Sequence, residues 1–79
     1  MMKLRILDMK EFLKTVNECA GPVNLVDSDG RRVNINKEYG IQAKLQAEYQ
    51  RNRKILSLCL EVPTPEDYLS IVYYYVGDC

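Results

Sequence analysis

The sequence contains no histidine and no tryptophan among its 79 residues. The absence of histidine excludes Ser/His and Cys/His nucleophile pairs, His-ligated metals, imidazole acid–base catalysis and phosphohistidine chemistry. An excess of either charge is also absent, because eleven basic residues balance eleven acidic ones. This balance gives no reason to expect nucleic acid or an anionic membrane as a partner. The sequence thus excludes several classes of function before it indicates one.

Cysteine is scarce, and long hydrophobic runs are missing. Cys19, Cys59 and Cys79 are odd in number, far apart and without CxxC spacing, which favours a reducing compartment over a disulfide framework. Charged residues interrupt residues 1–10, so this segment does not resemble a signal peptide. The longest uncharged stretch, residues 68–77, is too short to span a bilayer. We therefore expect a cytoplasmic protein that has no membrane segment, no metal site and no cofactor.

The residues that are present are typical of one small globular domain. Apolar residues make up 47% of the chain and charged residues 28%, a mixture that supplies enough apolar surface for a core at this length. We expect residues 1–79 to form a single domain that folds without disulfides or metals.

The spacing of apolar residues predicts the secondary structure. Apolar and polar residues alternate, as in strands with one buried face, in residues 2–7, 23–27, 31–35 and 55–62. Apolar residues recur at helical spacing in residues 9–20, 37–52 and 65–76. The order βαββαβα predicts an α+β fold in which a four-stranded antiparallel sheet carries all three helices on one face, an open-faced sandwich.

Capping residues mark the helix ends. Asp8 opens a capping box before the first helix, and Gly21 supplies a left-handed position after it. Asn36 is expected to cap the second helix. Thr64 is expected to cap the third, with Asp67 closing its capping box.

The same spacing predicts which side chains face the core. In a hairpin with Gly30 at the left-handed position of its turn, they are Val23, Leu25, Val33 and Ile35. In the second helix they form a narrow stripe of Ile41, Leu45 and Tyr49, and Gly40 marks a loose first turn or a close backbone approach. In the third helix they are Leu69, Val72, Tyr73 and Val76, with Tyr74 the most exposed of the tyrosines.

No motif indicates an enzyme. The sequence has no pair of carboxylates in an apolar setting, no glycine-rich phosphate loop and no serine in a nucleophile elbow. Two clusters are candidates for binding a partner: the tyrosines Tyr68 and 73–75, and the basic residues Arg51, Arg53 and Lys54. Core packing and a solvated helix end are the favoured interpretations of these clusters. The first and third predicted strands lack aromatic residues, which argues against an RNA-recognition domain.

Two stretches of local sequence fit a known family. Residues 10–13 (KEFL), running on to residues 22–26 (PVNLV), are similar to a KEFV-type first helix followed by a hydrophobic strand. Residues 33–41 (VNINKEYGI) are similar to a V-[DN]-A-K-S-I-M-G-[IV] segment, and the matching positions are Val33, Gly40 and Ile41. With these motifs and its order of elements, the chain resembles the HPr-like proteins of the phosphotransferase system, especially their short, divergent Gram-positive type. The resemblance covers most of the chain and implies an open-faced βαββαβα sandwich.

The chain departs from this family at the positions that carry its chemistry. Active HPr proteins place a G-[IL]-H-A-R-P loop before the first helix, whose N-terminus and arginine hold the phosphoryl group. Here Leu7 is followed by Asp8 and then directly by Met9, so the loop, its histidine and its arginine are missing. Asp8 also places a negative charge where the phosphate would lie. The position of the family's regulatory serine is occupied by Lys37.

The resemblance therefore implies a scaffold without the family's reaction. We expect no enzyme but a non-catalytic, HPr-like protein-interaction or regulatory module, linked to the phosphotransferase system, with an unidentified protein partner, as a monomer or weak dimer. The partner-docking edges of the family's first two helices imply a candidate surface of Met9, Phe12, Lys37, Tyr39 and Gln42. Two alternatives remain open: a phosphocarrier in name only, since there is no histidine to phosphorylate, and a small-molecule-binding regulatory domain of ferredoxin-like topology.

Overall fold

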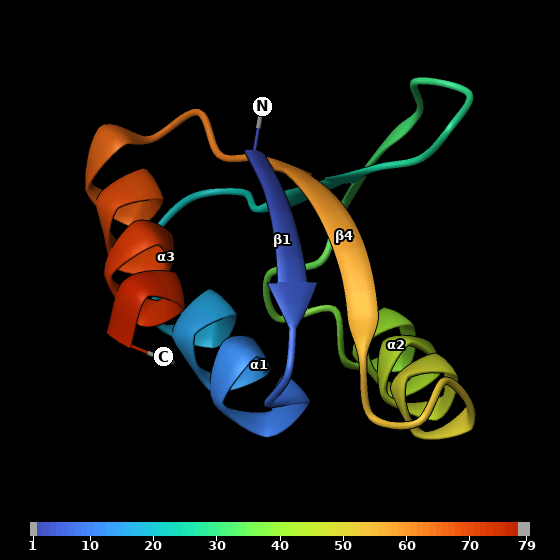
Figure 1. Ribbon diagram of the computed structural model, residues 1–79. Helices are drawn as coiled ribbons and strands as arrows, with labels where there is room; N and C mark the ends of the chain where they lie inside the picture. The colour runs from blue at the N-terminus through green and yellow to red at the C-terminus, as the bar shows by residue number, and fades with distance from the viewer. Residues whose placement is uncertain (1, 78–79) are drawn as a thin grey trace.

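Four strands and three helices follow one another in the order βαββαβα. Figure 1 shows how the chain is arranged in space. The structure is a computed structural model that describes the backbone of residues 2–77 and the side chains of residues 2–75. The elements are β1 (Met2–Ile6), α1 (Met9–Glu18), β2 (Asn24–Val26), β3 (Arg32–Asn34), α2 (Tyr39–Arg51), β4 (Leu56–Glu61) and α3 (Pro65–Gly77). In this part of the chain, no helix is both long and apolar enough to cross a membrane.

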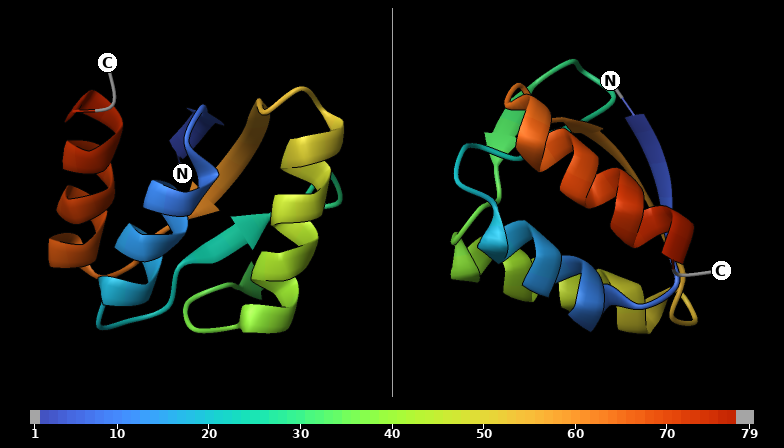
Figure 2. Two further views of the ribbon diagram at one scale, coloured as in Figure 1. Left: turned by 90° about the horizontal axis from the view of Figure 1, so that it is seen from below. Right: turned by 90° about the vertical axis from the view of Figure 1, so that its left-hand side faces the viewer.

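The sheet has the strand order β1-β4-β2-β3, and all neighbouring strands are antiparallel. In Figure 1, β1 and β4 lie in front of α1, and α3 lies beside β1. The left view of Figure 2 shows the three helices side by side, with α1 between α3 and α2. The face of the sheet away from the helices is open. The predicted α+β class, a four-stranded antiparallel sheet in an open-faced sandwich with three helices, is therefore confirmed.

The core lies between the sheet and the helices. In the register of β1 and β4, Leu4 lies opposite Leu58 and both are buried, whereas Lys3 lies opposite Cys59 on the open face. This alternation is the one predicted for the two strands. Among the described side chains, the wholly buried ones are Ile6, Phe12, Val16, Val23, Ile35, Leu60 and Ile71. Each of the larger ones stabilises the fold by about 1.5–3 kcal/mol through its removal from water.

The two ends of α1 differ from each other. Asp8 caps its N-terminus as predicted, because its carboxylate accepts a hydrogen bond from the N–H of Glu11 (3.2 Å). The prediction for the C-terminus is wrong: α1 ends at Glu18, the chain then becomes extended, and Gly21 is not left-handed. Gly21 provides space instead, since a Cβ atom there would lie 2.6 Å from Oγ1 of Thr64.

The β2–β3 hairpin turns at Gly30, whose φ of +83° is the left-handed conformation predicted for it. The carboxylate of Asp27 accepts hydrogen bonds from the N–H groups of Asp29 and Arg31, both at 2.9 Å. This carboxylate therefore serves the turn itself, in the way that aspartate commonly stabilises turns.

The hairpin contributes unequally to the core. Val23 and Ile35 are wholly buried and Leu25 is partly buried, as predicted. Val33 is 42% exposed, which contradicts the prediction. It lies opposite Leu25 on β3, the outer strand of the sheet, where packing neighbours are available on one side only.

Helix α2 begins two residues later than predicted. Its N-cap residue is Glu38, which makes no side-chain capping hydrogen bond. Asn36 does not cap the helix, because its side-chain amide donates instead to the carbonyl oxygens of Cys19 (3.0 Å) and Gly21 (2.6 Å). Asn36 thus joins the loop after α1 to the loop before α2.

The buried side of α2 is formed by Gln42, Leu45 and Tyr49. Leu45 and Tyr49 belong to the predicted stripe. Its third member, Ile41, is only partly buried, and the neighbouring Gln42 is buried in its place. The surroundings of Gly40 are open, which leaves the loose first turn as its explanation rather than a close backbone approach.

Helix α3 begins after Thr64, as predicted, but turns a different side to the core. The predicted stripe is wrong at Leu69 and Tyr73, which are 48% and 71% exposed. Ile71 is wholly buried, and Tyr74, predicted to be exposed, packs against the core. Of the two remaining members of the stripe, Val72 is partly buried, and the side chain of residue 76 lies outside the described part.

Candidate functional site

The orientation of α3 follows from the contacts of Asp67. Its carboxylate is buried and accepts hydrogen bonds from the N–H groups of Ala20 (3.0 Å) and Gly21 (2.7 Å), in the loop after α1. Backbone N–H groups bound to a carboxylate form hydrogen bonds stronger than neutral ones. The carboxylate therefore binds another part of the chain and does not close the capping box predicted for its own helix.

Tyr74 lies two turns further along the same side of α3. Its hydroxyl donates to the carbonyl oxygen of Asp8 (3.0 Å), and its ring packs against Phe12 with centroids 5.8 Å apart. The next residue, Tyr75, accepts a hydrogen bond from the N–H of Arg5 (3.4 Å) at the edge of β1. Together with Asp67, these contacts hold α3 against α1 and against the edge of the sheet.

Four large side chains consequently lie on the outside of α3. We call them the α3 face: Tyr68 (40% exposed), Leu69 (48%), Tyr73 (71%) and Tyr75 (37%). Residues 68–77 contain no charged side chain. Large apolar side chains on the helix of a small domain normally face the core. The α3 face is thus an apolar surface that the domain itself leaves uncovered.

The structure does not expose the candidate surface that the family resemblance implied. Met9, Phe12 and Gln42 are 2%, 0% and 5% exposed, so these three cannot form a docking surface. Met9 and Phe12 belong to the buried stripe of α1 that packs under the sheet. Of the five residues, Lys37 and Tyr39 are exposed, and Tyr39 is 66% exposed.

Polar contacts explain the burial of Gln42. Its side-chain amide donates to Oδ1 of Asn17 on α1 (2.7 Å) and to the carbonyl oxygen of Ile35 (2.8 Å). The same Asn17 oxygen accepts a hydrogen bond from the N–H of Lys37 (3.0 Å), whose backbone is left-handed with φ of 60°. The backbone of Lys37 is therefore tied to α1.

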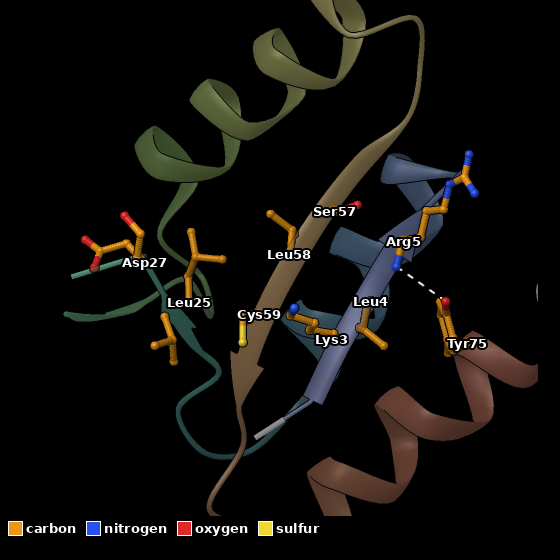
Figure 3. A pocket seen from close by; sticks show the side chains of 11 residues that line it. Lys3, Leu4, Arg5, Leu25, Asp27, Ser57, Leu58, Cys59 and Tyr75 are labelled. Carbon is orange, nitrogen blue, oxygen red and sulfur yellow. Dashed lines mark hydrogen bonds between the residues drawn. The ribbon is translucent and has the colours of Figure 1, made fainter. Parts of the chain in front are cut away.

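The open face of the sheet contains a shallow depression of about 640 Å³, shown in Figure 3. Ser57 and Cys59 of β4 and Lys3 of β1 line it, and Tyr75 of α3 lies at one side. Figure 3 shows the guanidinium of Arg5 pointing away from the depression. Its size is within the range of small-molecule sites.

The thiol of Cys19 is unreactive by position. Its side chain is 3% exposed, and burial, followed by the charges of Asp67 and Glu18, raises its pKa to about 11. A thiol with a raised pKa is a poor nucleophile at neutral pH, because the thiolate is the reactive form. In the described residues, no three Cys, Asp or Glu side chains gather into a group that could hold a metal ion.

The remaining charged groups are on the surface. Arg32 Nε donates to Oε2 of Glu61 at 2.8 Å, and this hydrogen bond holds the pKa of Glu61 below its ordinary value. The exposed residues Arg51, Arg53 and Lys54 lie where α2 ends, and the last two have left-handed backbones with φ of 59° and 60°. Exposed pairs and single charges of this kind stabilise a fold only slightly.

Comparisons with models of protein families, with curated proteins and with solved structures find no match to this chain. The resemblance to HPr-like proteins therefore rests on the sequence motifs and the order of the elements. The surfaces described above are what the structure adds. Among them, the α3 face includes Tyr68, Tyr73 and Tyr75 of the tyrosine cluster that the sequence offered as a binding candidate, although core packing was the favoured interpretation. The sequence did not indicate Leu69, which was expected to be buried together with Tyr73. The signal available in the sequence was the absence of charge from residues 68–77.

Proposed function

We propose that this chain is a non-catalytic, HPr-like protein-interaction module that binds its partner through the α3 face. The observation that carries the proposal is the exposure of Leu69 and Tyr73 on a helix that has no charge over residues 68–77. Exposed apolar patches of a few hundred Å² on a small domain are commonly interaction sites. Tyrosine is also enriched in interfaces and among the residues that dominate binding energy.

The departures from the HPr family support a binding role over a phosphocarrier role. No histidine is present in the 79 residues, and Asp8 occupies the N-cap of α1, where a phosphoryl group would need free N–H groups. Incubation with phosphoenolpyruvate and Enzyme I should therefore yield no acid-labile phosphate on this chain. Incorporation of such phosphate would overturn the non-catalytic assignment.

Site-specific photo-cross-linking tests the binding role. Tyr73 is replaced by p-benzoylphenylalanine in the cell that makes the protein, and Tyr39, an equally exposed tyrosine of the surface first implied by the family, is replaced in a matched control. We expect a discrete covalent adduct from position 73 and none from position 39. An adduct from position 39 alone would instead support the surface around Lys37 and Tyr39. The absence of adducts from position 73 would contradict the proposal.

A second candidate is a small-molecule-binding regulatory domain, favoured by the depression of about 640 Å³ on the open face. A ligand present at 100 times its dissociation constant stabilises the folded state by about 2.7 kcal/mol, which a thermal-shift screen of metabolites detects. The variant Ser57→Trp fills the depression and should abolish any such shift, whereas Lys44→Ala on α2 should preserve it. A shift that persists in Ser57→Trp would place the ligand elsewhere.

A further inference from the structure

The α3 face is large enough for a small interface between two chains. Taking about 150–250 Å² for a wholly exposed aromatic side chain and less for leucine, its four side chains expose roughly 400 Å². Two such faces in contact, with the atoms around them, remove on the order of 1,000 Å² from water. This area is near the lower limit for specific association between proteins.

The charge of the chain favours an identical partner. The net charge is zero, so two copies meet without long-range repulsion. The α3 face contains no charged side chain, so two copies bring no like charges together at the contact. A charged partner would gain no electrostatic attraction from this surface. The α3 face of a second copy, which is also uncharged, matches it in this respect.

The polar side chain beside these residues needs no partner from another chain. Leu69 and Tyr73 lie one turn apart on the exposed side of α3, and Ser70 lies next to them. The hydroxyl of Ser70 already donates to the carbonyl oxygen of Glu66 (3.1 Å). Covering this side of the helix therefore leaves the Ser70 hydroxyl paired.

We infer that two copies of this chain pair through their α3 faces about a two-fold axis, with the two helices antiparallel. In such an interface a contact between residues i and j occurs twice, so Leu69 of each copy meets Tyr73 of the other. In the antiparallel arrangement, the positive end of each helix dipole also lies beside the negative end of the other, which is favourable. The inference rests on the proposed function, because it names the partner of the same face.

Sedimentation equilibrium of the purified chain tests the inference. We expect a reversible dimer with a dissociation constant of about 1–100 μM, as suits an interface of this size. Tyr73→Glu should raise that constant by about 30-fold or more, because the large apolar side chain is lost and a carboxylate is buried in both copies. Tyr39→Glu makes the same chemical change on α2 and should leave the constant unchanged. Circular dichroism verifies that both variants are folded.

A mixing experiment tests the antiparallel register. Leu69→Lys and Tyr73→Glu should each be monomeric alone, since each homodimer would bury two charges against apolar groups. Mixed together, they should form a heterodimer, because one contact becomes a Lys–Glu pair and the other remains the original Leu69–Tyr73 contact. Failure of the mixture to associate would overturn the proposed pairing.

A chain that stays monomeric up to roughly 500 μM would overturn the inference, since the interface would then be weaker than its area implies. The cross-linking experiment separates this failure from a failure of the proposed function. An adduct at position 73 with the mass of two chains supports the dimer. An adduct with another protein would support the proposed interaction module and contradict the inference that its partner is a second copy.

Discussion

Buried side-chain oxygens and amides hold the loops of this small domain in place. The loop after α1 is bound from two sides: the carboxylate of Asp67 accepts hydrogen bonds from the N–H groups of Ala20 and Gly21, and the amide of Asn36 donates to the carbonyl of Gly21. Irregular backbone that is partly buried needs such partners for its polar groups. At the scale of single residues, polar side chains thus determine how the helices are attached.

Asp67→Ala should be strongly destabilising. The change leaves two N–H groups without their acceptor, and we expect the free energy of unfolding to fall by about 2–4 kcal/mol. Urea denaturation followed by circular dichroism measures the loss. Glu66→Ala, on the exposed side of the same helix turn, is the control and should change stability by about 0.5 kcal/mol or less. A loss below about 1 kcal/mol for Asp67→Ala would contradict the role given to this carboxylate.

The thiol of Cys19 should make stability depend on pH in the alkaline range. Burial, then the charges of Asp67 and Glu18, raise its pKa from 9.0 to about 11. Between these values the unfolded chain has lost this proton and the folded chain retains it. The contribution of the thiol to the free energy of unfolding is therefore fully present below pH 9 and decreases as the pH rises toward 11. Urea denaturation at several pH values measures the decrease. Cys19→Ala should show a smaller decrease over the same range, and an equal slope in both proteins would exclude this origin.

At the scale of elements, the sequence predicts best where one face of an element is clearly apolar. The stripe of α1 and the alternation of β1 and β4 are as expected, because no other side of these elements competes for burial. In α2 and α3, the side that is buried is chosen by a polar residue. Gln42 bonds to Asn17 and to the carbonyl of Ile35, and Asp67 bonds to the loop after α1. The spacing of apolar residues does not predict these hydrogen bonds, and so it does not predict which side of the helix is buried.

The candidate site was predicted less well than the fold for the same reason. The family resemblance placed a docking surface at Met9 and Phe12, but the structure buries both on the inner side of α1. The exposed Leu69 and Tyr73 were expected to be buried, since residues 68–77 contain no charged side chain that would mark the side facing water. Long-range contacts made by Asp67 and Tyr74 decide the rotation of α3, and these are visible only in three dimensions.

Two adjacent tyrosines of α3 provide a direct test of this rotation. Tyr74→Phe removes the hydrogen bond to the carbonyl of Asp8 and should lower the free energy of unfolding by about 0.5–1.5 kcal/mol. Tyr73→Phe removes only an exposed hydroxyl and should have an effect within about 0.5 kcal/mol. Both are measured by denaturation at low protein concentration, where self-association does not contribute. The reverse order of effects would support the stripe predicted from the sequence.

At the scale of the whole molecule, the sheet consists of two parts that are joined narrowly. Within residues 2–77, five residue pairs connect β1 to β4, whereas two pairs, Asn24 with Glu61 and Leu25 with Leu60, connect β4 to the hairpin. The outer edges also differ. The edge of β1 is covered by α3 through Tyr75, while β3 is short and exposed along its length. A short edge strand that carries arginine is a common protection against unwanted strand pairing.

This division predicts that the hairpin opens before the rest of the sheet. Local opening is easiest where few buried contacts and hydrogen bonds must break, so amides of β2 and β3 should exchange with deuterium at least tenfold faster than those paired between β1 and β4. Hydrogen exchange followed by NMR measures each amide. Asn36 bonds the loops on both sides of the hairpin to each other, and Asn36→Ala should therefore accelerate exchange in β2 and β3 while leaving β1 and β4 nearly unchanged. Equal acceleration in all four strands would mean that the sheet opens as one cooperative unit, and that the narrow junction at Asn24 and Leu25 does not separate it.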